Sequence, residues 1–98
     1  MKWEKWKNKG GIPELTEPGI YFIAYSDYDF SKTNFSIRKE IVYIGMSISK
    51  KGVKGRLYQF EKAMEGKDKI HGGAERVRFK HPDNEKFFRN AFLAVKSF

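Results

Sequence analysis

The chain has 98 residues and a formal charge of +8 at neutral pH, from 20 basic and 12 acidic residues. It contains no cysteine, which excludes disulfide bridges and thiolate metal sites and suits a reducing compartment. No apolar run reaches the roughly 18 to 20 residues of a membrane span and residues 1–11 are too polar for a signal peptide, so we expect a soluble, intracellular (cytoplasmic) protein without a membrane partner.

The length allows one small core, because a chain this short buries only about two-thirds of its unfolded surface. Nine Phe, five Tyr and two Trp supply large apolar area per residue. We expect an N-terminal extension over residues 1–17 and one folded domain over residues 18–98. In the extension, Trp3 and Trp6 would share one face of a helical turn. They would either dock on the domain, which we favour, or stack on bases of single-stranded DNA.

Alternating apolar residues predict two strands. Residues 19–25 place apolar side chains on both faces, which is typical of a strand covered on both sides. Residues 41–46 form the second strand. The connection between them is longer than a tight hairpin needs, so we expect extended strand ends around a loop near residues 31–34.

A basic turn and a helix follow the second strand. Apolar residues recur with helical spacing at Val53, Leu57, Phe60 and Met64, which predicts a helix over residues 53–66. Arg56 lies about 70° from the centre of this stripe and so flanks the core. The turn before the helix contributes further cations at Lys50, Lys51 and Lys54.

The positive charge is concentrated after the second strand. Residues 50–80 hold ten basic and four acidic residues, whereas the rest of the chain is nearly balanced. Such a surplus is expected of a surface that binds nucleic acid, although a solvated helix face would look the same. We expect Lys50, Lys51, Lys54, Arg76 and Arg78 to contact DNA.

The C-terminal third has two readings. Residues 74–80 predict a short basic helix that ends before Pro82. Residues 91–98 fit either a helix begun at Asp83 or a buried strand, and we prefer the strand because two strands alone make a weak sheet. Glu85 then lies in a polar loop. The expected fold is α/β (α+β), with a small, mainly antiparallel three-stranded sheet flanked by helices.

Several residues suit the cleavage of a phosphodiester. Arg56 offers a bidentate fork to phosphate oxygens. Tyr21 and Tyr43 would place two phenols near the same phosphate. A phenol has an ordinary pKa near 10, so acting as a base at neutral pH would require nearby cations that stabilise its phenolate form. Gly45 would let the substrate backbone approach the strand. His71 is either a general base or a phosphate contact, or a loop residue without a catalytic role.

The order of these features resembles the GIY-YIG nuclease family. Gly-Ile-Tyr at residues 19–21, Tyr-Ile-Gly at 43–45 and Arg56 on the next helix carry the resemblance, which covers roughly residues 18–97. It implies a three-stranded sheet flanked by helices and an active site of Tyr21, Tyr43, Gly45 and Arg56. It also implies hydrolysis of DNA with one Mg²⁺ or Mn²⁺, as in the homing and restriction branches.

The chain departs from the family pattern at two places. Phe60 stands where many members have a Tyr or His, so a motif tyrosine or His71 would act as the base. The family's metal-binding glutamate follows the third strand, where this chain ends, so the domain looks C-terminally incomplete unless Glu85 is the ligand. The alternatives are a catalytically inactive DNA-binding module of the same fold and a protein-interaction domain. The latter would use aromatic residues expected to be exposed: Trp3, Trp6, Tyr28 and Phe35.

Overall fold

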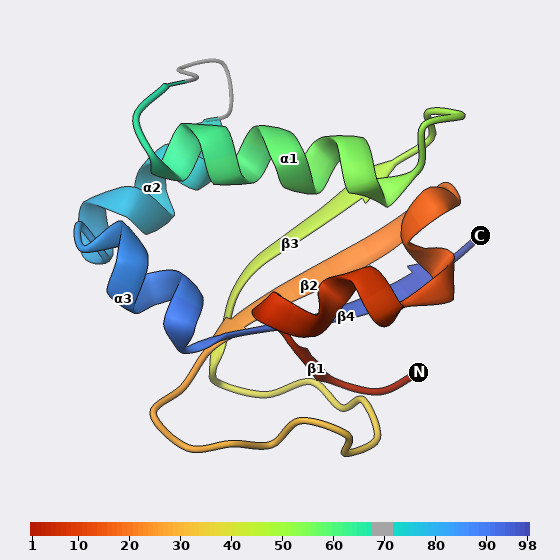
Figure 1. Ribbon diagram of the computed structural model, residues 1–98, viewed down its shortest axis with the longest axis horizontal. Helices are drawn as coiled ribbons and strands as arrows, with labels where there is room; N and C mark the ends of the chain where they lie inside the picture. The colour runs from red at the N-terminus through yellow and green to blue at the C-terminus, as the bar shows by residue number, and fades with distance from the viewer. Residues whose placement is uncertain (68–71) are drawn as a thin grey trace.

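The protein folds around a four-stranded antiparallel sheet with the strand order β1-β4-β2-β3 (Figure 1). The computed structural model describes residues 1–67 and 72–98. The three long strands are β2 (Gly19–Tyr25), β3 (Ile41–Ser47) and β4 (Ala91–Ser97), with β2 between the other two. The strands expected at both tripeptides and at the C-terminus are confirmed, and the chain is an α+β domain.

The sheet has one strand more than the three expected. β1 (Glu4–Lys5) pairs with Leu93 and Phe92 at the outer edge of β4. This strand is two residues long and lies in a lysine-rich segment, so it shows no alternation from which it could be predicted. It forms because its backbone finds a partner at the other end of the chain.

The described residues form three α-helices, which follow one another along one side of the sheet (Figure 1). They are α1 (Val53–Met64), α2 (Gly72–Lys80) and α3 (Asn84–Arg89). The apolar stripe of α1 is buried, as predicted, and the basic helix expected at residues 74–80 is confirmed within α2. No helix among residues 1–67 and 72–98 is long and apolar enough to cross a lipid bilayer.

The polar loop expected around Glu85 is wrong. The Asp83 carboxylate accepts a hydrogen bond of 3.0 Å from the Lys86 backbone N–H and caps α3. Helix and strand, which we treated as alternatives for the C-terminal segment, therefore both occur in succession. Capping by one aspartate and burial of Phe87 stabilise this helix of 6 residues.

Trp3 and Trp6 are buried on opposite faces of the sheet, so the expectation of a shared helical face is wrong. Trp3 packs against Phe30 and Phe35, with 5.3 Å between ring centroids in each pair. Trp6 opens the 3₁₀-helix η1 (Trp6–Gly11) and packs on Phe88 on the helical side. The intervening β1 separates the two rings. Docking on the domain is confirmed, and neither tryptophan is exposed for bases or a protein partner.

Residues 26–40 form an irregular loop instead of extended strand ends. The Lys32 N–H donates to the Trp3 carbonyl at 2.7 Å, and Phe30 stacks on Phe92 of β4 at 4.2 Å. The loop thus covers the sheet face opposite the helices, but only at one end. At the other end Ile44 and Met46 of β3 are 56% and 54% exposed. No residue of β2 is exposed, so the expectation that this strand is covered on both sides is confirmed.

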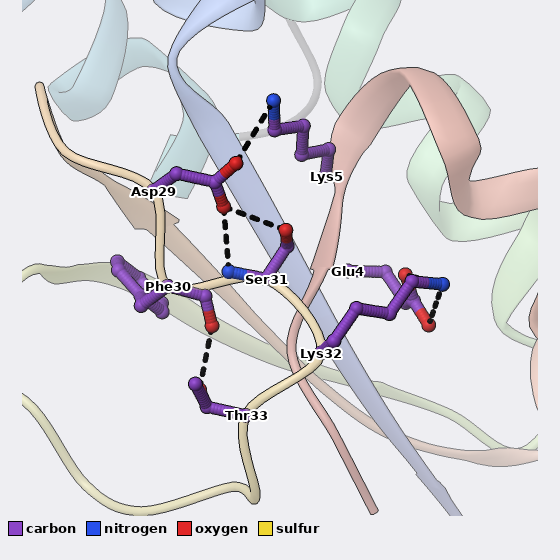
Figure 2. A network of polar contacts seen from close by, with 7 residues as sticks. All are labelled: Glu4, Lys5, Asp29, Phe30, Ser31, Lys32 and Thr33. Carbon is purple, nitrogen blue, oxygen red and sulfur yellow. Dashed lines mark hydrogen bonds and ion pairs between the residues drawn. The ribbon is translucent and has the colours of Figure 1, made fainter.

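Asp29 ties this loop to β1 (Figure 2). The Ser31 backbone N–H and hydroxyl donate to Asp29 Oδ1 at 2.8 and 2.6 Å, and Lys5 Nζ lies 3.0 Å from Oδ2. The hydrogen bonds from Ser31, followed by the contact with Lys5, lower the pKa of Asp29 from 3.8 to about 2. The negative charge on Asp29 is therefore favoured by folding.

We expect Asp29→Asn to lower the free energy of unfolding at neutral pH. Because the pKa of Asp29 is lower in the folded chain, its contribution is complete above about pH 4 and is lost as the pH falls through about 2. Urea unfolding of both proteins across this range should show the difference shrinking. Asp27→Asn, at an exposed neighbouring aspartate, should change nothing, and a difference independent of pH would contradict the prediction.

Candidate active site

The first turn of α1 is fixed against the beginning of β2. Gly52, just before the helix, has a φ of +77°, and a Cβ there would overlap the backbone of Thr16 and Glu17. The Val53 N–H then donates to the Glu17 carbonyl at 3.0 Å. This junction places Arg56, in the first turn of α1, close to the Tyr21 hydroxyl of β2.

Tyr21 lies over Gly45. The two residues face each other across β2 and β3, and a Cβ at Gly45 would overlap the Tyr21 ring, with 2.9 Å to Cε1. Tyr21 is fully buried, and its ring centroid is 6.0 Å from that of Tyr43. The structure thus brings together Tyr21, Tyr43, Gly45 and Arg56. The ring of Tyr21 fills the space over Gly45, which explains why this position holds glycine.

Tyr43 is supported by a residue that the sequence did not indicate. A Cβ at Gly73, near the start of α2, would overlap the Tyr43 ring, with 3.0 Å to both Cζ and the hydroxyl oxygen. Phe60 also packs on the Tyr43 ring, at 5.4 Å between centroids. The only signal for Gly73 is the Gly-Gly pair at residues 72–73, which by itself indicates no more than a loop end.

The Tyr21 hydroxyl is buried and forms no hydrogen bond of acceptable geometry with any residue the structure describes. Burial, reinforced by the nearby Tyr43 hydroxyl, raises its pKa to about 12. The Arg56 guanidinium lowers the same pKa but does not outweigh these effects. At neutral pH, Tyr21 is therefore a protonated hydrogen-bond donor that lacks a described acceptor, next to a cation.

The electrostatic potential around Arg56 favours a negatively charged ligand. Its Nη1 donates to Gln59 Oε1 at 2.8 Å, and Gln59 was not indicated by the sequence. The first turn of α1 contains Lys54 and Arg56 but no acidic residue. The positive end of the helix dipole adds to this potential, although the Val53 N–H itself is taken by Glu17, so the turn suits an anion.

The residues expected to contact DNA are spread over two surfaces. Lys50, Lys51 and Lys54 are exposed, but Lys54 lies on the flank of α1 away from Arg56, where it lines a cleft with Lys9 and Tyr58. On α2, Arg76 is exposed. Arg78 contacts Gly66 and approaches Glu75 to 3.8 Å, so it also joins α2 to the end of α1.

Two expected residues are not placed in this site. His71 lies outside the described residues. Glu85 is exposed in the first turn of α3, a helix that packs against η1, and no described hydrogen bond or ion pair links it to Tyr21, Tyr43 or Arg56. Among residues 1–67 and 72–98, no group of three or more Asp, Glu or His side chains gathers. The described phenols and guanidinium do not form the carboxylate donor set that Mg²⁺ prefers.

Comparisons with models of known protein families, with curated proteins and with solved structures found no match to this chain. The candidate site is therefore identified only by the arrangement of its own residues.

We expect alkaline titration to identify Tyr21 as the phenol that ionises at about pH 12. Phenolate absorbance of Tyr21→Phe should lack this component, whereas Tyr58→Phe, at an exposed position on α1, should keep it. Because the unfolded chain releases its proton first, the free energy of unfolding should fall between about pH 10 and 12, and less so in Tyr21→Phe. Equal titrations would contradict the burial of this hydroxyl.

Gly73→Ala should displace the Tyr43 ring, while Gly72→Ala should not. A Cβ at Gly72 meets nothing within 4 Å, which makes the neighbouring position a matched control. Overpacking of this kind typically costs about 1–3 kcal/mol. NMR shifts of the Tyr43 ring and urea unfolding would measure both effects, and similar results for the two variants would show that Gly73 does not support Tyr43.

Proposed function

We propose that the site formed by Tyr21, Tyr43 and Arg56 binds a phosphodiester group of DNA, and that the chain is an endonuclease of the GIY-YIG type. The observation that carries the proposal is the buried Tyr21 hydroxyl, which has no described acceptor and lies next to the Arg56 guanidinium. Because this hydroxyl is covered, an anion would reach it when the Arg56 side chain leaves Gln59, and would then accept from both donors. The order of the two tripeptides and the arginine along the chain supports the same conclusion.

Each residue then has a distinct role. Arg56 exchanges its contact with Gln59 for two phosphate oxygens and stabilises the charge that grows on them. Tyr21, protonated at neutral pH, donates to the same phosphate and does not act as a base. Tyr43, fixed on Gly73, orients the attacking water or removes its proton.

Hydrolysis forms a bond from the water oxygen to phosphorus and breaks the bond from phosphorus to the leaving sugar oxygen. The leaving oxygen keeps the electron pair of that bond and takes up a proton, and the attacking water gives one up. The resemblance implies that Mg²⁺ or Mn²⁺ assists. The phenols and the guanidinium of this site are not the carboxylate donors that such an ion prefers, so the roles above belong to the chain's own residues.

Plasmid cleavage with Mg²⁺ or Mn²⁺ tests the proposal. Arg56→Ala should reduce the nicking rate by about 100-fold or more, a loss typical of removing one donor to the transition state. Its fold should persist, because the side chain is partly exposed and donates to Gln59, a neighbour on the same helix. Gln59→Ala, which removes that partner only, should keep cleavage.

Other outcomes separate the alternatives. Loss of cleavage in Glu85→Ala would make Glu85 a metal ligand after all. Steeply salt-dependent DNA binding without cleavage by the wild-type chain would indicate an inactive DNA-binding module. Absence of both binding and cleavage would refute the proposed function.

A further inference from the structure

The solvent face of α2 carries a large aromatic side chain between cations. Phe79 is 87% exposed, more than any other large apolar side chain among the described residues. Arg76 precedes it by three positions and Lys80 follows directly, so all three project from one side of the helix. Ala74 and Val77 hold the opposite side in the core.

Packing among the described residues does not account for this exposed ring. Phe87 and Phe88 in the neighbouring α3 each pack against other aromatic rings, whereas no described ring lies against Phe79. One carboxylate, that of Glu75, lines the same cleft as Phe79 and approaches Arg78 to 3.8 Å, so Arg76, Arg78 and Lys80 leave a net positive charge around the ring. An exposed ring in a region of net positive charge matches nucleic acid, which combines negative phosphates with flat apolar bases.

The position of Phe79 relative to the candidate active site supports this partner. Gly73, on which the Tyr43 ring rests, and Phe79 belong to the same helix. Six residues of α-helix separate them by about 9 Å along the axis. The exposed ring and the Tyr43 contact therefore belong to one helix, but lie about 120° apart around its axis.

We propose that Phe79 is a wedge that enters a base step of duplex DNA while Arg76 and Lys80 hold the flanking phosphates. The proposal rests on the proposed function and adds a substrate class to it. A single ring on a convex helix suits insertion into one step better than stacking along a run of single-stranded bases. Insertion costs least where bases unstack easily, so the preferred DNA contains a mismatch or a flexible pyrimidine–purine step.

The test measures binding of the full chain to a short duplex with 2-aminopurine beside a central mismatch, and to the matched duplex. A chelator is present so that a metal-dependent nuclease leaves the DNA intact. We expect the wild-type chain to raise 2-aminopurine fluorescence several-fold and to prefer the mismatch. Phe79→Ala should bind the mismatched duplex about 10-fold more weakly and lose the fluorescence change.

Two variants serve as controls. Phe79→Leu keeps an apolar wedge and should retain most of the effect. Phe98→Ala removes another exposed phenylalanine, 69% exposed at the end of the chain, and should match the wild type. If Phe79→Ala and the wild type bind and unstack the DNA equally, the wedge is refuted while DNA binding stands. If no variant binds DNA, both proposals are refuted.

Discussion

The hydrogen bond from the Val53 N–H to the Glu17 carbonyl holds the candidate site together. The next carbonyl, that of Pro18, accepts from the Phe98 N–H, so the start of α1, the start of β2 and the end of β4 meet at adjacent residues. Gly52 permits this approach because any side chain there would overlap the backbone opposite. These backbone contacts fix the start of α1, and Arg56 with it, against β2. Such a support is more rigid than a loop would be.

Around this junction the chain departs from what stability alone would favour. The buried Tyr21 hydroxyl lacks a described acceptor, which typically costs about 1–3 kcal/mol. Acidic residues occupy the first turns of α2 and α3, at Glu75 and Glu85, but α1 begins with Lys54 and Arg56 instead. Departures of this kind concentrate where a site must attract a ligand, because the ligand supplies the missing partner when it binds. Both occur at the same place, which is why we assign the anion to the space beside Arg56.

Local sequence patterns predicted most helices and strands of this fold, whereas pairings between distant segments could not be predicted from them. Alternation identified β2 and β3, and helical spacing identified α1, because both periodicities are read within one segment. β1 could not be found in this way, since its pairing depends on Leu93 at the far end of the chain. The site shows the same division. Tyr21, Tyr43 and Arg56 follow from motif order, but Gly73 requires knowing that α2 folds back against Tyr43.

Helix α2 connects the tyrosines to the basic surface, and its packing allows it little independent movement. Ala74 and Val77 are buried, and the Tyr43 ring occupies the space at Gly73. Beyond the helix, the His81 N–H donates to the Val77 carbonyl, and the His81 ring packs on Tyr25 at 4.6 Å. A tilt of α2 would have to disturb these contacts together, because close-packed interiors have few voids to absorb it. The exposed face of α2 is therefore held at a fixed distance from Tyr43, so a ligand bound to that face, as we propose for DNA, would be aligned with the tyrosines by one rigid element.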